Sequence, residues 1–355
     1  MLEANKVVGS DLLTSSLDRV LATLYHEEPD EVPCIWAFAS KPMEDLFKRK
    51  GISLPPSDII TISDVIKFKV LKKSCRSYVL ESPFGSLHLY DYYSRGYGCR
   101  KLLKPAIINV DDVERVPSPT LCEELIDLVE KYVRKYGEKF FLMVSHRGAF
   151  DSPWYYLRGF TKWLIDLVRN PDWANKLIKI ALEPQIEVTK ELIKLGVHGV
   201  WVIGDLGNGK RLFISPQTYL KAIYPWHRKL VEEYHKLGAF VFLHSHGNLN
   251  PIIRLFEYIV KAGFDAINPL DTSEGMDLKY IKENYGDDIT LIPQPSTIVL
   301  EKLKLKEICN YVRNQFKVCA PGGGFIYFAV IVYMSLNEAL NYIKCVERYR
   351  RYPLK

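Results

Sequence analysis

From about Gly137 onward, short apolar runs alternate with longer stretches in which apolar residues recur every three or four positions. The runs "KFFLMVSHRG", "VHGVWVIGD" and "AFVFLHSH" are rich in β-branched and aromatic residues, as buried parallel strands are. Helical patterns follow them, and the one that begins at Ser215 and Pro216 carries an N-cap and a first-turn proline. The pattern predicts repeated strand–helix units.

Two architectures fit such units: an open doubly wound sheet and a closed (β/α)8 barrel. A doubly wound sheet normally has a glycine-rich phosphate-binding turn after an early strand, and this sequence has none. Polar residues or glycines instead stand at the end of nearly every predicted strand: His146, Arg147, Asp205, His244, His246, Asp271, Gln294, Gly322, Gly323 and Gly324. In a barrel the strand ends converge on one mouth, where active sites are built. We therefore expect an α/β protein with a single (β/α)8 TIM barrel.

The N-terminal part, residues 1–136, is less regular than the best barrel-like part, residues 137–350. Its segment "YVLESPFGSLHLYDYYS" predicts a β-hairpin that turns at Pro83–Gly85. No low-complexity or Pro/Gly/Ser-rich linker separates the two parts, so the sequence predicts one domain over residues 1–355.

Composition narrows the class of protein. Hydrophobic residues make up 48% and charged residues 25% of the chain, and the formal net charge is +6, without the clustered basic motif of a nucleic-acid-binding protein. Seven cysteines, an odd number with no CxxC pair, favour reduced thiols. No signal peptide and no membrane-length apolar run is evident. We expect a cytoplasmic protein that acts on a small-molecule substrate and has no nucleic-acid or membrane partner. The sequence leaves open whether the protein forms a homodimer.

The segment "AFVFLHSH" carries the most distinctive chemistry. Alternation along a strand places Phe240, Phe242, His244 and His246 on one face, so both imidazoles would stand at the barrel mouth. Two imidazoles could provide two ligands to a catalytic zinc ion, which needs three protein ligands. They could instead transfer protons or bind an anion, or only form hydrogen bonds at a strand end. The sequence alone leaves these alternatives open.

Other strand-end residues are candidates for the same site. Asp205 ends "VWVIGD", and Asp271 and Glu274 follow another predicted strand, as pocket carboxylates or as helix caps. His146 and Arg147 could bind an anion. The remaining candidates for substrate contact are Gln294, Gly322 and Gly323. The segment "GDLGNGKR" has the spacing of a phosphate-binding loop, but Arg211 follows where Ser or Thr is needed, so we interpret it as a strand-to-helix loop.

An ordered series of motifs resembles the uroporphyrinogen decarboxylase superfamily. It runs from "YLRGFTKWLIDLVRNPDWANKLI" through "GDLGNGKRLFISPQTYLKAIYPWHRKLVEEYHKLGAFVFLHSHGN" to "PGGGFIY", and covers residues 137–350 well. The superfamily contains the haem-pathway decarboxylase and methyltransferases that move methyl groups between corrinoid proteins and thiols or folates. The resemblance implies a barrel with its pocket at the carboxyl ends of the strands.

The details separate the branches of the superfamily. The decarboxylase has an arginine-rich "RQAGR" segment near its N-terminus, where this chain reads "VPCIWAFASKPMEDLF". The zinc methyltransferases carry His-x-Cys and a later Cys, where this chain has His244, His246 and, near the last position, Ile331. A zinc site would therefore need Asp205, Glu274 or Cys319 as its third ligand.

Three functions follow in order of preference. The first is methyl transfer by Asp205, His244 and His246, with zinc as the candidate metal and a corrinoid carried by a partner protein. The second is cofactor-independent decarboxylation of uroporphyrinogen or a related substrate in porphyrin biosynthesis, with Arg95, Arg100 or Arg147 binding carboxylates. The third is a non-catalytic tetrapyrrole-binding barrel.

Overall fold

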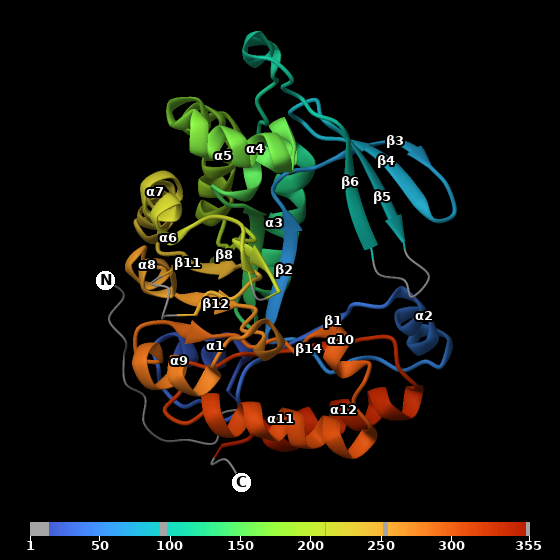
Figure 1. Cartoon of the computed structure of the whole chain (residues 1–355). Helices are drawn as coiled ribbons and strands as arrows, with labels where there is room; N and C mark the ends of the chain where they lie inside the picture. The colour runs from blue at the N-terminus through green and yellow to red at the C-terminus, as the bar shows by residue number, and fades with distance from the viewer. Residues whose placement is uncertain (1–13, 93–97, 210, 251–254, 353–355) are drawn as a thin grey trace.

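The computed structural model describes residues 14–92, 98–209, 211–250 and 255–352. Parallel strands form the centre of the molecule (Figure 1). They are β1 (Cys34–Phe38), β2 (Ile59–Asp64), β7 (Phe141–Arg147), β8 (Gly199–Ile203), β11 (Phe240–His244), β12 (Ala266–Asn268), β13 (Thr290–Leu291) and β14 (Tyr327–Ile331).

The strands close into a barrel. Six of them form a continuous sheet in the order β13-β12-β11-β8-β7-β2, and β1 pairs with β14. The two groups are joined at both seams: Leu291 bridges to Phe325, and the Asp58 amide donates to the Cys34 carbonyl over 2.9 Å. The predicted (β/α)8 barrel is confirmed. The two strands β1 and β2 show that it already begins in the N-terminal third.

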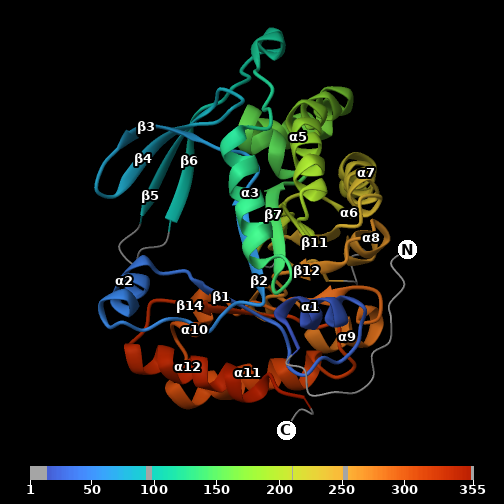
Figure 2. The ribbon, with the colours of Figure 1, turned by 180° about the vertical axis from the view of Figure 1, so that it is seen from behind.

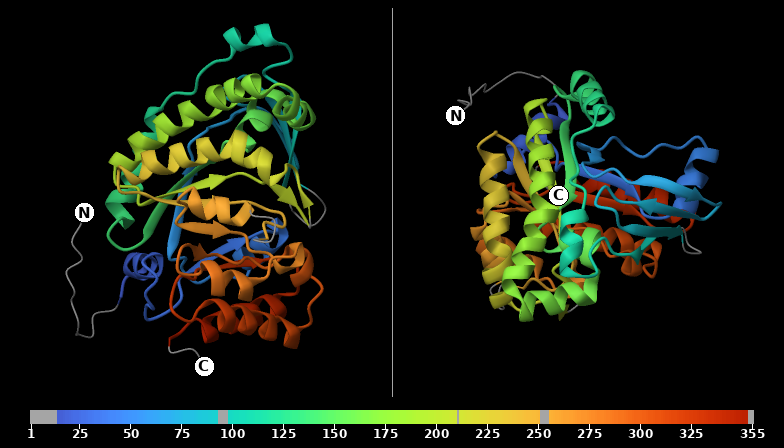
Figure 3. Two further views of the ribbon diagram at one scale, coloured as in Figure 1. Left: turned by 60° about the vertical axis from the view of Figure 1, so that its left-hand side comes forward. Right: turned by 90° about the horizontal axis from the view of Figure 1, so that it is seen from above.

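Helices surround the barrel and cover its apolar strands (Figures 1 and 3). They are α3 (Glu123–Tyr136), α4 (Phe160–Arg169), α5 (Pro171–Lys194), α6 (Pro216–Thr218), α7 (Tyr224–His235), α8 (Leu255–Lys261), α9 (Leu278–Tyr285), α10 (Thr297–Leu300), α11 (Leu305–Cys319) and α12 (Leu336–Tyr349), with a π-helical turn η2 (Pro153–Arg158) before α4 and another, η3 (Tyr219–Ile223), between α6 and α7. Outward-facing strand residues such as Val241 and Leu243 pack under these helices.

A second apolar cluster fills the barrel interior. Phe141 and Phe242 stack with their ring centroids 5.9 Å apart, and Trp201 lies edge-on to Phe242. Helix α1 (Ser16–Leu24) contributes Val20 and Leu24 to this cluster. The helix therefore plugs the end of the barrel at which the strands begin, and leaves the carboxyl ends of the strands as the open mouth.

A four-stranded antiparallel sheet is inserted between β2 and α3. It contains β3 (Lys69–Lys73), β4 (Ser77–Glu81), β5 (Leu87–Tyr92) and β6 (Gly98–Lys104), and it confirms the predicted hairpin between β4 and β5. The sheet projects from the side of the molecule toward which β8 and β11 run, above helix α2 (Lys41–Arg49) (Figures 1 and 2).

Two further predictions concern cysteines and membranes. Cys309 of α11 and Cys345 of α12 form a disulfide, so the expectation that all thiols are reduced is wrong for this pair. Among the helices of the described residues, none combines the length and the apolar content that a bilayer crossing requires.

Candidate active site

Strand β11 carries both histidines of the predicted site to the barrel mouth. Phe242 points into the barrel interior, as the alternation predicted, and His244 and His246 follow on the same side. Their rings lie edge to face with centroids 5.2 Å apart. Between them, the Ser245 hydroxyl accepts a 2.9 Å hydrogen bond from the Leu206 amide, which ties the loop after β8 to the loop after β11.

The protonation of His244 is determined by the neighbouring strand. Asn268 donates its Nδ2 to the Ile292 carbonyl over 3.0 Å, so its Oδ1 is the atom that accepts from His244 Nδ1 over 2.7 Å. Burial lowers the pKa of His244, although Asp205 opposes this effect. A neutral ring with its proton on Nδ1 leaves the lone pair of Nε2, which lies 3.9 Å from Asp205 Oδ1.

His246 has the opposite electrostatic environment. Burial disfavours its charge, but the hydrogen bond to Glu274 and the nearby Asp205 outweigh this effect, so the pKa of His246 is raised. Its Nδ1 lies 3.3 Å from Glu274 Oε2, and its backbone amide donates to Asp205 Oδ1 over 3.1 Å. The side chain of His246 is 39% exposed, so its ring is open to the cavity.

Glu274 joins three loops of the mouth. Its Oε2 accepts from the Gly247 amide over 2.9 Å, and its Oε1 accepts from the Gly209 amide over 3.2 Å. Burial acts to raise the pKa of Glu274, but the hydrogen bond from His246 and these amides lower it overall. Gly247 has φ +104°, and a Cβ there would lie 2.6 Å from the Gly207 Cα, so only glycine fits beside His246.

A cavity of about 620 Å³ opens next to His246. The carboxylates of Asp205, Asp271 and Glu274 line it, together with Gln294, and no Lys or Arg of the described residues does. Asp271 also accepts from the Ser273 amide over 2.8 Å, and burial raises its pKa. The cavity therefore has an acidic wall and suits a neutral or cationic group better than a polycarboxylate.

Arg147 lies at the edge of the mouth. Its Nη1 donates to Asp151 Oδ2 over 2.7 Å, and its guanidinium lies 3.5 Å from the centre of the Tyr155 ring. Asp151 is fully buried, and this burial raises its pKa despite the opposing charge of Arg147. Arg147 is therefore already paired with Asp151. The side of its guanidinium that faces Asp151 is not available for the anion that the sequence predicted it to bind. Of the other two predicted carboxylate partners, Arg100 lies 4.4 Å from the ring centre of Phe68, and Arg95 lies outside the described residues.

The prediction that His146 binds substrate is wrong. The ring is fully buried, its Nε2 pairs with the Tyr234 hydroxyl over 2.7 Å, and its Nδ1 lies 2.9 Å from the Arg147 carbonyl. Burial lowers its pKa to about 4. Because successive side chains alternate along β7, His146 points outward into the helix layer when Arg147 points to the mouth.

The glycine run and Cys319 do not lie at the mouth, where the sequence predicted them. Gly322 and Gly323 precede β14 instead of following it, so they lie at the closed end of the barrel, where a Cβ on Gly323 would lie 2.5 Å from the Glu27 carbonyl. Cys319 ends α11 at the same side of the barrel, and burial raises its thiol pKa to about 12. These residues cannot contact a substrate at the mouth.

The donor atoms at the mouth do not fit a zinc ion. No three His, Cys, Asp or Glu side chains of the described residues are gathered as metal ligands. The Nδ1 atoms of His244 and His246 face Asn268 and Glu274, which leaves their two Nε2 atoms as donors, and Cys319, a candidate third ligand, is at the opposite end. A catalytic zinc needs three protein ligands, so the arrangement is better suited to proton transfer than to metal binding.

Sequence reasoning missed Asn268 and Asp151. Asn268 stands directly opposite His244 in the β11–β12 pairing, which determines the contact between their side chains. The sequence contains a polar residue at the end of "FDAIN", but the pairing register is needed to connect it to His244.

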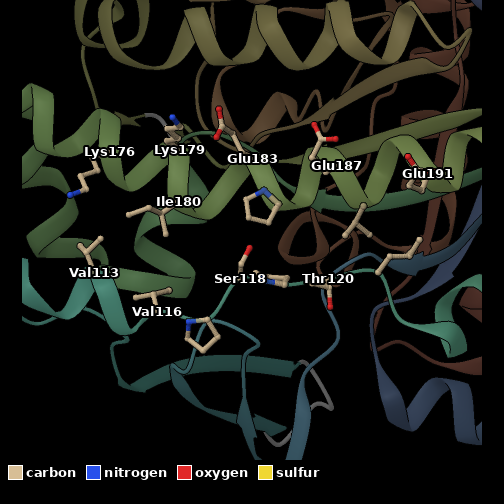
Figure 4. A pocket seen from close by; sticks show the side chains of 15 residues that line it. Val113, Val116, Ser118, Thr120, Lys176, Lys179, Ile180, Glu183, Glu187 and Glu191 are labelled. Atoms are coloured by element: carbon tan, nitrogen blue, oxygen red, sulfur yellow. The ribbon is translucent and has the colours of Figure 1, made fainter.

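A larger cavity lies outside the barrel. It has about 800 Å³ and is formed by α5 and the segment 113–121 (Figure 4). Val116, Ile180 and Val188 contribute its apolar lining, and Glu183 and Glu187 project beside it from α5. It contains no histidine or cysteine, and it does not include any of the mouth residues.

Comparisons with known proteins agree with this architecture. A methyltransferase from Methanosarcina mazei has a similar structure, with a TM-score of 0.61 and 14% sequence identity over 94% of this chain and 99% of that chain. Two other solved structures are too different to support a conclusion. One is a 3-keto-L-gulonate-6-phosphate decarboxylase from Vibrio cholerae, with a TM-score of 0.29 and 8% identity over 63% of this chain and 79% of that chain. The other is a β-1,4-mannanase from Aplysia kurodai, with a TM-score of 0.35 and 12% identity over 65% of this chain and 73% of that chain.

No curated protein matches the sequence significantly. The family model described as "Uroporphyrinogen decarboxylase (URO-D)" matches residues 94–327, which is more than half of the chain and includes every residue of the mouth cavity. The chain therefore belongs to the uroporphyrinogen decarboxylase (URO-D) family.

Proposed function

We propose that this protein is a methyltransferase-like enzyme that moves a methyl group from a corrinoid donor, carried by a partner protein, to a small acceptor at the barrel mouth. The observation that carries the proposal is the acidic cavity beside His246, which has three carboxylates and no described Lys or Arg in its wall. Such a wall disfavours a polycarboxylate such as uroporphyrinogen, whose carboxylates need cationic partners.

His246 is the proposed general base. Its imidazole accepts the proton of an acceptor X–H, the X–CH3 bond forms as the bond between the methyl carbon and the donor breaks, and the donor keeps that electron pair. Glu274 stabilises the imidazolium that results, because its carboxylate lies 3.3 Å from Nδ1. No metal is required in this scheme, which agrees with the lack of a three-donor group among the described residues.

His244 and Asp205 have a positioning role in the proposal. Asn268 fixes the His244 tautomer with the Nε2 lone pair free, and this atom can accept a hydrogen bond from the acceptor molecule. Asp205 holds the His246 backbone through its Oδ1. The structurally similar protein from Methanosarcina mazei is a methyltransferase, which is consistent with the proposal, although its 14% identity supports only the fold.

The test is a comparison of two reactions with the same purified protein. We expect wild-type protein to consume methylcobalamin in the presence of a panel of small thiols and amines, measured by the change in the corrinoid absorbance. His246→Ala should lower this rate by about a hundredfold or more. His235→Ala is the matched control, because this histidine pairs with Asp265 away from the cavity.

Decarboxylation is the outcome that would contradict the proposal. If the wild-type protein releases CO2 from uroporphyrinogen and leaves methylcobalamin unchanged, the second of the sequence-based functions is correct. If neither reaction occurs and a tetrapyrrole binds, the non-catalytic function is supported instead.

A further inference from the structure

The mouth has a second charged region, which is basic and lies outside the acidic cavity. Arg147 ends β7, and Arg100 lies in β6 of the antiparallel sheet. The guanidinium of Arg147 lies 3.5 Å from the ring centre of Tyr155, and the guanidinium of Arg100 lies 5.2 Å from the same ring centre. Two elements that are separate in the fold therefore bring two cations to one tyrosine.

The described residues compensate these cations only in part. Arg147 has Asp151 as its ion-pair partner, whereas no carboxylate oxygen in the described part of the chain lies within 4.0 Å of Arg100. Asp64, at the end of β2, faces both arginines from beyond that distance, and its Oδ1 accepts from the Ile66 amide over 2.8 Å. Burial raises the pKa of Asp64, although the Ile66 amide and both arginines oppose this effect.

One more titratable side chain faces the two arginines. His88 of β5 is buried, and its Nε2 lies 2.9 Å from the Ser86 hydroxyl. Burial lowers the pKa of His88 to about 4, and the charges of Arg100 and Arg147 act in the same direction. The imidazole is therefore neutral at pH 7, and it neither adds to the charge of the arginine pair nor cancels it.

Aromatic rings hold the guanidinium of Arg100 in place. Its central carbon lies 4.4 Å from the ring centre of Phe68 and 5.8 Å from that of Tyr90, in addition to its contact with Tyr155. Rings that stack on a planar guanidinium leave the N–H groups at its edge for an acceptor. Among the described residues, none accepts a hydrogen bond from this guanidinium. Arg100 is therefore oriented by the fold but not paired by it.

The strand register connects this region with the histidines. Arg147 of β7 is paired with Ile203 of β8, and Ile203 is paired with His244 of β11. Neighbouring strands are about 4.8 Å apart, so the backbones of Arg147 and His244 are about 10 Å apart. Burial lowers the pKa of His244, and the charge of Arg147 adds to this effect. One small molecule can therefore span the arginine pair and the acidic cavity.

We infer that Arg147 and Arg100 bind an oxyanion of the methyl acceptor, while the reacting end of the acceptor lies in the acidic cavity beside His246. This inference rests on the proposed function and adds the class of acceptor to it. The acceptor carries one anionic group, such as a carboxylate, and its reacting end is neutral or cationic. Such a molecule has a charge distribution complementary to the two regions of the mouth.

The probe is a series of ω-mercaptocarboxylates of increasing chain length, each compared with its uncharged primary amide. Binding is measured by isothermal titration calorimetry without a methyl donor, so the result does not depend on turnover. We expect wild-type protein to bind the best acid at least about tenfold more tightly than its amide, because hydrogen bonds between a guanidinium and a carboxylate are charge-assisted. The chain length of the best acid then measures the separation of the two regions.

The variant is Arg100→Gln, which should weaken the binding of the acid at least about tenfold and leave that of the amide unchanged. Arg100→Lys keeps the charge but loses the planar fork, so it should weaken the acid less. The matched control is Lys101→Gln, because it removes the same charge from the next residue of β6, whose side chain points to the opposite face of the sheet.

Three results would overturn the inference. Equal losses in Arg100→Gln and Lys101→Gln would show a general charge effect. Equal affinities of acid and amide at every chain length would show that the mouth has no site for the anion, and so would the lack of binding of any acid. The comparison of acid with amide in wild-type protein holds even if Arg100→Gln is less stable.

The same acids separate this inference from the proposed function. If wild-type protein binds them in a way that depends on Arg100, but transfers no methyl group to them from methylcobalamin, the anion site stands and the proposed reaction fails. If methyl transfer proceeds equally well to acid and amide in both wild type and Arg100→Gln, the reaction stands and the anion site fails.

Discussion

Each end of the barrel contains a pair of side chains that can carry opposite charges, but the two pairs differ in how much they are exposed. At the closed end, Arg350 donates to Asp58 over 2.8 Å and to the Val32 carbonyl over 3.1 Å, and the side chains of Arg350 and Asp58 are only 6% and 3% exposed. At the mouth, His246 meets Glu274 over 3.3 Å and remains 39% exposed. The first pair has no surface left for a ligand, whereas the second has a ring open to a cavity.

This difference separates stabilising groups from catalytic candidates. Asp58 also accepts from the Cys34 amide and from the Ser16 hydroxyl, so it connects β1, β2, α1 and the end of α12. A buried pair with all its hydrogen bonds made holds the fold together. At the mouth, partly exposed groups with shifted pKa values can change their protonation state when a substrate binds.

The largest effect should come from the mouth. His246→Ala removes the proposed base, so kcat should fall about 10²- to 10⁴-fold in the methyl-transfer assay. The urea midpoint of unfolding should change little, because the ring is partly exposed. If the variant loses stability but keeps its rate per folded molecule, His246 stabilises the fold and is not the base.

The closed end should respond in the opposite way. Arg350→Ala leaves the buried Asp58 with only Arg19, 3.5 Å away, as a cationic partner, and we expect a loss of about 3 kcal/mol in the free energy of unfolding, measured by urea denaturation. Arg351→Ala is the matched control, since this side chain is 76% exposed, and it should stay within about 0.5 kcal/mol of wild type. Equal effects of the two substitutions would contradict the structural role of the Arg350–Asp58 pair.

The glycine run sharpens the same comparison. Gly322 and Gly323 both have positive φ, but a Cβ meets nothing within 4 Å at Gly322 and the Glu27 carbonyl at Gly323. Gly322→Ala should therefore cost about 1–2 kcal/mol from backbone strain, and Gly323→Ala about 1–3 kcal/mol more, in urea denaturation. A change in the KM of the acceptor in either variant would restore the original prediction that these glycines bind substrate.

The smallest effect is a shift of the pH profile. A neutral His246 is needed as base, so kcat/KM should fall as the pH falls through its raised pKa. Glu274→Gln removes a partner that raises this pKa, so the acid limb should move to lower pH. Asp277→Asn, which alters only a helix cap at α9, should leave the profile in place. An unmoved acid limb in Glu274→Gln would exclude the coupling between His246 and Glu274.

The sequence by itself determined the barrel and the placement of β11. Alternation in "AFVFLHSH" correctly placed His244 and His246 beyond Phe242 on the inward face, because a strand has a strict two-residue period. It also placed Asp205, Asp271, Glu274 and Gln294 near one mouth, since the carboxyl ends of parallel strands meet there.

Only the tertiary structure decided which of these residues meet. His146 and Arg147 are adjacent in sequence, yet one is buried against Tyr234 and the other reaches the mouth. Asn268 contacts His244 because of the β11–β12 register, and Gly323 lies at the closed end because the run precedes its strand. Local periodicity determines the face of a strand, whereas register and the order of strand and loop determine long-range contacts, which no local pattern contains.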